Sequence, residues 1–310
     1  MAQQRLKLLL AFASVYVIWG STYLTIRWAI ETIPPFTMAG VRYATAGAIL
    51  VAAARWRGAA WPTATQWRSA AVVGVLLLTG GNGGVTWSEL RVPSGLAALV
   101  VAAVPMWIVL MDWIRPSGVH PGRAAILGIV LGLVGVGLLV NPAASDTARI
   151  DPVGTAALIV ATVSWAAGSI YSRHAPVARP LMNAGANMLC GGAGLLTLGA
   201  IMREPQHFAW QAVSAKSLLS LAYLVVFGAV VGFTAYVWLL RHTTPARAAT
   251  YAYVNPVVAV FLGWLLANEP ITPRVLAAAA VIIAAVVTIT AGPAVRIWMR
   301  RRTEAVIGDA

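Results

Sequence analysis

The sequence contains few of the residues from which enzyme active sites and soluble surfaces are usually built. Only 10% of its 310 residues are charged, and it has nine acidic residues, four histidines and one cysteine. A single cysteine excludes an intramolecular disulfide, and neither an HExxH zinc motif nor a P-loop is present. We therefore expect a protein that is not an enzyme, binds no metal and uses no cofactor.

Ionisable side chains are also missing from the middle of the apolar stretches. The acidic residues and the histidines all fall in links, in tails or in the last turn of a stretch. A carboxylate or imidazole deep inside a membrane helix is the usual sign of a proton relay. Its absence favours facilitated diffusion over tight proton coupling.

Long apolar runs dominate what is present. Hydrophobic residues make up 60% of the chain, and a helix needs about 20 mostly apolar residues to cross a bilayer. Ten such stretches lie at approximately 8–28, 36–54, 69–88, 94–113, 123–140, 152–171, 181–202, 217–240, 246–267 and 273–292. The sequence therefore predicts an all-α membrane protein with ten transmembrane helices, embedded in a lipid bilayer.

Basic residues are distributed unevenly between the two sides of the predicted membrane. The net charge of +13 is typical of nucleic-acid-binding proteins, but fifteen of the 22 Lys and Arg residues fall on the side that holds the N-terminus. Loops rich in Lys and Arg stay in the cytoplasm. We therefore expect cytoplasmic N- and C-termini in a bacterial-type inner (plasma) membrane, and no nucleic-acid partner.

The two halves of the chain resemble each other. Trp19 and Arg27 recur 146 residues later as Trp165 and Arg173. Four further pairs recur at a spacing of 151 residues. They are Trp87 and Trp238, Pro105 and Pro256, Trp113 and Trp264, and Arg123 and Arg274. Several rare residues at one spacing indicate an internal repeat.

Each half holds five predicted helices. An odd number of helices makes the second half enter the membrane from the opposite face, so the repeat is inverted. Inverted repeats are typical of secondary transporters, with the substrate site between the halves near the midplane. We predict a first five-helix repeat over residues 1–145 and a second, inverted repeat over residues 146–310, around a central cavity.

Three segments carry a resemblance to a known family. They are IWGSTYLTIRWAIETIPPFTMAGVRY (18–43), VPSGLAALVVAAVP (92–105) and YAYVNPVVAVFLGWLLANEPIT (251–272). They resemble the EamA type of the drug/metabolite transporter (DMT) superfamily, with amino-acid exporters of the YddG kind as close analogues. The resemblance implies a ten-helix metabolite exporter. It also implies that the first, third, fourth, sixth, eighth and ninth helices line the cavity, and that the other four are peripheral.

Aromatic residues at matching depths are the first candidates for substrate contact. Trp19 and Trp165 lie about twelve residues into their helices, and Trp107 is similarly deep. They either line the cavity or pack with the indole N–H bonded to a neighbouring helix; the mirrored depth leads us to favour the cavity wall. Thr22 and Tyr23 share the helix face of Trp19 and give it two hydroxyls.

Further candidates lie where glycine or proline interrupts a helix. The glycines of TGGNGGVTW (79–87) either unwind the helix around Asn82 or let it approach its neighbours closely. Pro105 and Pro256 act either as hinges for alternating access or as static bends. The remaining substrate-binding candidates are Ser169, Tyr236, Tyr251, Tyr253 and Asn255.

Together these features predict a secondary transporter that exports small metabolites, with aromatic or hydrophobic amino acids as the expected cargo. A multidrug or nucleotide-sugar-type carrier on the same scaffold is the alternative, and a membrane-embedded enzyme or a receptor is a third reading. An anionic nucleotide sugar would favour several basic cavity residues, whereas Arg27, Arg42 and Arg173 lie near helix ends. Neutral or zwitterionic cargo is therefore favoured. A monomer is sufficient for this function, and a homo-oligomer is compatible with it.

Overall fold

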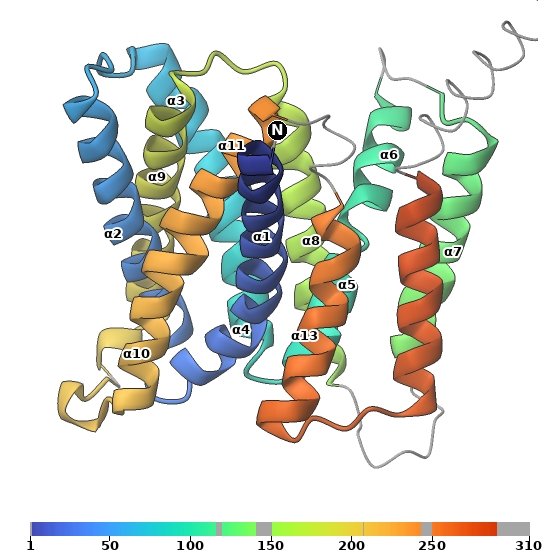
Figure 1. Cartoon of the computed structure of the whole chain (residues 1–310). Coiled ribbons are helices and arrows are strands. Elements are labelled where there is room, and N and C mark those ends of the chain that lie inside the picture. The colour runs from blue at the N-terminus through green and yellow to red at the C-terminus, as the bar shows by residue number, and fades with distance from the viewer. Residues whose placement is uncertain (1, 116–119, 141–150, 207, 243–249, 290–310) are drawn as a thin grey trace, which may run out of the picture.

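The computed structural model of the protein is a bundle of roughly aligned helices (Figure 1). It describes residues 2–115, 120–140, 151–206, 208–242 and 250–289, and within these ranges it contains no strand. Seven helices in these ranges are long and apolar enough to cross a membrane, and three shorter apolar helices accompany them. The predicted all-α membrane fold with ten spans is therefore confirmed.

Some spans consist of more than one helical segment. The described segments are α1 (Ala2–Ala29), α2 (Pro35–Trp56), α3 (Ala64–Val73), η1 (Gly74–Asn82), α4 (Gly83–Ser88), α5 (Ser94–Val101), α6 (Val104–Ile114), α7 (Arg123–Val140), α8 (Pro152–Ser172), α9 (Pro180–Ile201), η2 (Glu204–Gln206), η3 (Trp210–Ala212), α10 (Ala215–Tyr223), η4 (Leu224–Val231), α11 (Gly232–His242) and α13 (Tyr251–Ala267). The tenth span is the helix over Pro273–Ile289.

Local sequence explains where several helices begin. The helices α2, α8 and α9 each start with a proline, whose fixed φ suits the first helical position and whose missing N–H is not needed there. Thr63 and Gln66 form a capping box at the start of α3. The Asp151 side chain accepts a hydrogen bond from the Gly154 N–H at the start of α8. This bond and the nearby Arg91 guanidinium lower the pKa of Asp151.

The third and eighth spans both widen into a π-helix, η1 and η4 respectively. Shifting residues 74–82 by the 151-residue repeat spacing gives 225–233, which overlaps η4. The helices α1 and α8, which open the two predicted halves, run in opposite directions (Figure 1). π-helices are rare and cluster at functional sites. Their matching positions therefore indicate that these two spans are places to look for a functional site.

The two matching prolines have different structural consequences. The fourth span is interrupted at Ala102 and Ala103, and Pro105 lies in the first turn of the new helix α6. Pro256 instead lies inside α13, which is continuous. Of the two positions, only Pro105 therefore adjoins an actual break in its helix.

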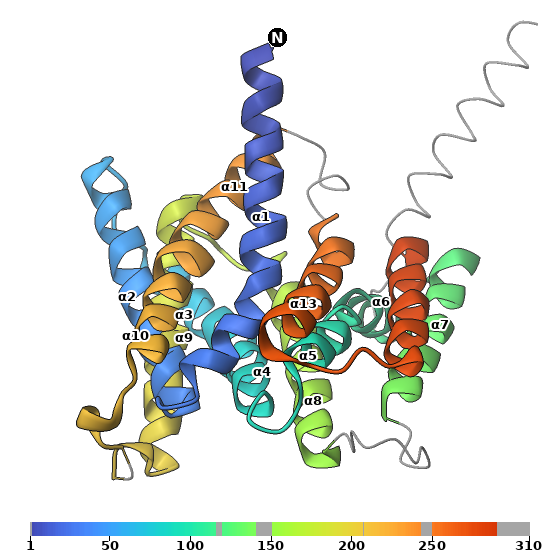
Figure 2. The same ribbon diagram turned by 60° about the horizontal axis from the view of Figure 1, so that its bottom comes forward.

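Two helix pairs flank the bundle, α2 with α9 on one side and α7 with the tenth span on the other (Figures 1 and 2). Glycines bring these partners close together. A methyl group on Gly47 would lie 2.9 Å from the carbonyl oxygen of Gly185, and one on Gly128 would lie 3.0 Å from that of Ala285. The second, fifth, seventh and tenth helices are thus peripheral, as the family resemblance implies.

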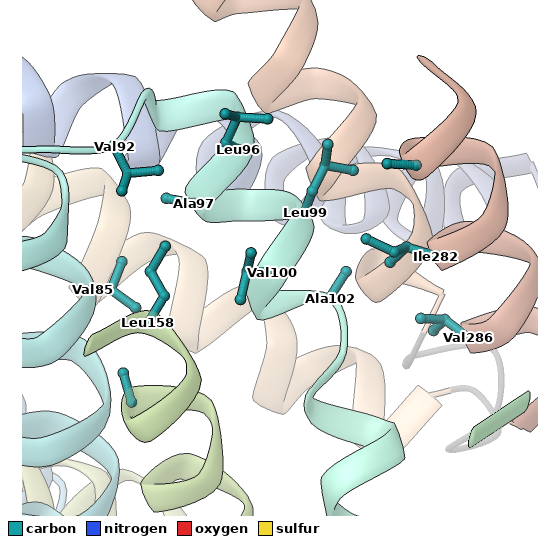
Figure 3. Close-up of a cluster of buried hydrophobic side chains, with 12 residues drawn as sticks. Val85, Val92, Leu96, Ala97, Leu99, Val100, Ala102, Leu158, Ile282 and Val286 are labelled. Atoms are coloured by element: carbon teal, nitrogen blue, oxygen red, sulfur yellow. The ribbon is translucent and has the colours of Figure 1, made fainter. Parts of the chain in front are cut away.

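The largest buried cluster surrounds α5, whose residues Ser94 to Val100 are all buried (Figure 3). Its members come from α4, α5, α8 and the tenth span. They are Val85, Val92, Leu96, Ala97, Leu99, Val100, Ala102, Leu158, Ala161, Ala278, Ile282 and Val286. A helix that is apolar on all sides belongs in the interior, and α5 occupies that position.

Candidate functional site

Trp19 lies in an aromatic cluster that joins α1, α11 and α13. Its ring centroid is 5.3 Å from that of Tyr236 and 5.0 Å from that of Tyr251, and the two tyrosine rings are 5.6 Å apart. The Trp19 indole N–H donates a 3.1 Å hydrogen bond to the carbonyl oxygen of Gly228 in η4. The structure thus brings together three predicted site residues that come from both halves of the chain.

Trp19 and Trp165 make reciprocal contacts with glycines of the other half. A methyl group on Gly232 would lie 2.9 Å from Cδ1 of Trp19, and one on Gly81 would lie 2.9 Å from Cε3 of Trp165. These two glycines are 151 residues apart, which is the spacing of the repeated residue pairs in the sequence, so the two contacts occupy matching positions. Both tryptophans thus pack against the other half, and in the described part of the chain only Trp19 also makes the indole N–H bond that the packing interpretation includes. Contact of either tryptophan with substrate stays a prediction.

Two of the predicted hydroxyls, those of Thr22 and Ser169, are bonded within their own helices. Thr22 Oγ1 donates to the Trp19 carbonyl oxygen at 2.6 Å, and Ser169 Oγ donates to that of Trp165 at 2.8 Å. Each hydroxyl oxygen keeps lone pairs that can accept a further bond. Tyr23 packs against the buried cluster around α5.

The structure gives the other predicted residues different surroundings. Trp107 packs in a cluster of α6, α7 and the tenth span that contains Met106 and Ile289. Asn255 in α13 is buried, and its Oδ1 has no hydrogen-bond partner among the described residues. Tyr253 belongs to α13, but its side chain lies outside the described part of the chain.

The glycine-rich segment of the third span lies close against the second half. Methyl groups on Gly81, Gly83 and Gly84 would each lie within 3.0 Å of an atom of Trp165, Leu195 or Ala161 respectively. The segment is π-helical up to Asn82 and α-helical after it, so it is not unwound. The close-approach interpretation of these glycines is therefore the one that the structure supports.

Three polar residues form a stripe along this span, Asn82, Thr86 and Glu89. They are spaced i, i+4 and i+7 and so share one helix face. Asn82 Oδ1, Thr86 Oγ1 and both Glu89 carboxyl oxygens are buried without a hydrogen-bond partner in the described structure. We call these residues the polar stripe. Of the three, only Asn82 is a candidate from the sequence, although the helical spacing of Thr86 and Glu89 is visible in NGGVTWSE (82–89).

Glu89 lies just beyond the third span, yet it is only 4% exposed. Burial raises the pKa of its carboxyl group, and the neighbouring Glu269 carboxylate acts in the same direction. Arg27 and Arg42 partly oppose this shift. Position at a helix end thus did not place this acid in water. Glu89 still lies outside the middle of its span, and facilitated diffusion stays a prediction.

Arg42 also differs from the expectation of a helix-end residue. It is the eighth residue of α2, about 10 Å along the helix axis, and it is 5% exposed. A methyl group on Gly228 would lie 3.2 Å from Arg42 Nη2 and 3.3 Å from Thr22 Cγ2. The guanidinium therefore lies beside the aromatic cluster, because Gly228 also accepts the Trp19 hydrogen bond.

At the end of the bundle away from the N-terminus, one carboxylate connects three central helices. Glu269, just after α13, pairs with Arg27 of α1 at 2.9 Å. It also accepts hydrogen bonds from the Ser94 N–H and hydroxyl, both at 2.8 Å, and from the Gly95 N–H at 3.0 Å, at the start of α5. These contacts hold α1, α5 and α13 together at this end.

Comparison with known proteins gives a consistent family match. The model of the EamA-like transporter family matches residues 6–141 and 152–291. The chain is 38% identical over 291 residues to the "Uncharacterized inner membrane transporter YedA" of Escherichia coli (strain K12), covering 94% of this chain and 92% of that protein. It is 26% identical to the "WAT1-related protein At3g02690, chloroplastic" of Arabidopsis thaliana, over 88% of this chain and 67% of the relative.

A solved crystal structure also matches the fold. It aligns with a TM-score of 0.61 at 20% identity and covers 92% of this chain and 96% of its own. At this identity the likeness shows a shared fold alone.

Proposed function

This chain belongs to the EamA-like transporter family, and on that premise we propose that it exports aromatic or hydrophobic amino acids. Transport proceeds by alternating access between two inverted halves, residues 1–145 and 146–310. The protein lies in a bacterial-type inner membrane with both termini in the cytoplasm. The distribution of basic residues supports this orientation, and the name of the YedA relative supports the membrane.

The cluster of Trp19, Tyr236 and Tyr251 is the observation that carries this proposal. It joins helices of both halves, so movement of one half against the other changes its geometry. Aromatic faces bind apolar side chains, and the buried Arg42 guanidinium lies beside the cluster. An amphiphilic amino acid has an apolar side chain that the aromatic rings would contact and a polar end that the guanidinium would contact.

The contacts of Glu269 support alternating access. Because they tie α1, α5 and α13 together at one end, opening that end requires Glu269 to separate from Arg27 or from the start of α5. The break at Ala102 and Ala103 and the two π-helices are places where backbone geometry departs from a regular α-helix. We assign the hinge to the break next to Pro105 and treat Pro256 as its less flexible counterpart.

Efflux from proteoliposomes tests the function. Liposomes containing the purified protein are loaded with a panel of labelled amino acids and diluted, with protein-free liposomes as the control. We expect the protein to accelerate efflux of aromatic and hydrophobic amino acids. Release of a cationic dye without release of any amino acid would favour the multidrug alternative.

The same preparation tests energy coupling. A pH gradient is imposed across the liposome membrane, and accumulation of the labelled cargo against its own gradient is measured. Accumulation would show proton coupling, and equilibration alone would show facilitated diffusion.

A further inference from the structure

Arg42 is a buried cation without an anionic partner in the described part of the chain. Its Nε is buried and has no hydrogen-bond partner, and its guanidinium carbon lies 4.8 Å from the centroid of the Tyr43 ring. A buried charge is costly unless it is paired. A guanidinium has five donors in a planar fork and no acceptor, so the complementary group is a carboxylate or another planar anion.

The polar stripe offers hydrogen-bond acceptors and therefore needs a donor, whereas Arg42 offers donors and needs an acceptor. The unpartnered atoms of Asn82, Thr86 and Glu89 are all oxygens, and all can accept hydrogen bonds. They lie on one helix face, so a single group with several donors can approach more than one of them. An ammonium group has three donors, no acceptor and a positive charge that Glu89 would neutralise.

Arg42 and Glu89 are close enough to influence each other electrostatically, yet they do not form an ion pair with each other. The other charged groups around Glu89 are already engaged, because Arg27 pairs with Glu269 and Glu269 also binds the start of α5. A buried guanidinium and a buried carboxyl group therefore lie near each other, and neither forms an ion pair among the described residues.

We propose that Arg42 and the polar stripe form the polar end of the cargo site and recognise a zwitterion. The Arg42 guanidinium receives the cargo carboxylate, and Glu89, with Thr86 and Asn82 behind it, receives the cargo ammonium group. The Trp19 cluster beside Gly228 then contacts the cargo side chain. This inference rests on the proposed amino-acid export and names the groups that select for it.

Binding of three related probes to the purified full-length protein tests the proposal. The probes are phenylalanine, its decarboxylated analogue phenethylamine and its deaminated analogue phenylpropionate, and the dissociation constants are measured by titration calorimetry in detergent. We expect Arg42→Gln to weaken binding of phenylalanine and phenylpropionate by at least about tenfold and to change phenethylamine by less than about twofold. Glu89→Gln should weaken phenylalanine and phenethylamine and leave phenylpropionate nearly unchanged.

Three further variants make the result decisive. Arg42→Lys keeps the charge but loses the planar fork, so it should bind phenylpropionate more tightly than Arg42→Gln and less tightly than the wild type. Arg57→Gln at the exposed end of α2 and Glu31→Gln at the exposed pair with Lys216 remove the same charges elsewhere, and they should leave all three constants unchanged.

The outcomes separate this inference from the proposed function. If the wild type binds phenylalanine and both Arg42→Gln and Glu89→Gln bind it equally well, the zwitterion site is overturned. The proposal of amino-acid export is then unaffected. Binding of phenylpropionate but not phenylalanine, lost in Arg42→Gln, would support the role of Arg42 and contradict an amino-acid cargo. If Arg42→Gln weakens the binding of all three probes by the same factor, Arg42 has a structural role, and the proposal is also overturned.

Discussion

Trp19 and Trp165 occupy matching places in the two halves, yet their surroundings differ. Each packs on a glycine of the other half, Gly232 and Gly81 respectively. Trp19 also donates a hydrogen bond to η4 and contacts two tyrosine rings. In the described part of the chain Trp165 makes neither kind of contact. The equivalent bond to η1 comes from Ser164, whose hydroxyl donates to the Leu76 carbonyl oxygen at 2.8 Å.

The polar residues diverge in the same way. Aligning α2 with α9 from their first prolines places Arg42 opposite Asn187, and the 151-residue spacing places Glu89 opposite Leu240. Backbone features such as the π-helices and the close glycines are thus shared by both halves, whereas Arg42 and Glu89, the buried ionisable groups without an ion pair among the described residues, both lie in the first. The difference indicates that the two halves share their backbone packing but differ in their buried polar side chains.

The largest expected effect comes from adding a methyl group at the two matched glycines. Gly232→Ala should displace the Trp19 ring, break its bond to Gly228 and reduce transport by about tenfold or more, because overpacking costs about 1–3 kcal/mol. Gly81→Ala should reduce transport less, because Trp165 has no such bond to lose. Gly137→Ala is the control, since a methyl group there meets no atom within 4 Å. Equal transport losses at Gly81 and Gly232 would contradict a special role for the Trp19 side.

A smaller effect is expected from removing single hydrogen bonds. Trp19→Phe and Ser164→Ala each delete a bond to a π-helix, worth about 1 kcal/mol, and we expect each to slow efflux roughly fivefold. Trp165→Phe deletes no such bond and should remain near wild type, as should Trp56→Phe at a ring that is 92% exposed. Efflux rates at equal protein content provide the measurement. If Trp165→Phe is impaired as strongly as Trp19→Phe, the two halves are functionally equivalent.

The smallest expected effect concerns stability and pH. Because burial raises the pKa of Glu89, the folded protein holds this proton more tightly than the unfolded chain. Ionisation at higher pH therefore lowers the stability of the wild type progressively above the usual carboxyl range. Glu89→Gln cannot ionise, so in detergent it should unfold at a higher temperature than the wild type at about pH 8.

The two proteins should unfold at similar temperatures at about pH 4, where an ordinary Glu carboxyl is largely protonated. Glu31→Gln, at an exposed ion pair, should lack this pH-dependent difference. A Glu89→Gln protein that is less stable than the wild type at about pH 8 would show that the ionised carboxylate stabilises the fold.

Much of the candidate site was visible in the sequence, but its grouping was not. Trp19 was identified by its depth, Tyr251 by its place before Pro256 and Tyr236 by its residue type on the eighth helix, and the structure places their rings together. Trp107 was selected by the same depth argument, yet it packs towards a flanking helix. Depth along a helix follows from residue number, whereas the direction of a side chain depends on which neighbour lies beside it.

The sequence by itself determined the number of spans and the family and predicts the repeat, because apolar length and residue spacing are properties of the local chain. It did not determine which charges at helix ends are buried. Arg42 and Glu89 are withdrawn from water by helices that are distant in sequence, and their burial follows from how those helices pack. Only the tertiary structure could place the unpaired Arg42 guanidinium beside the aromatic cluster and bury the Glu89 carboxyl group without a hydrogen-bond partner among the described residues.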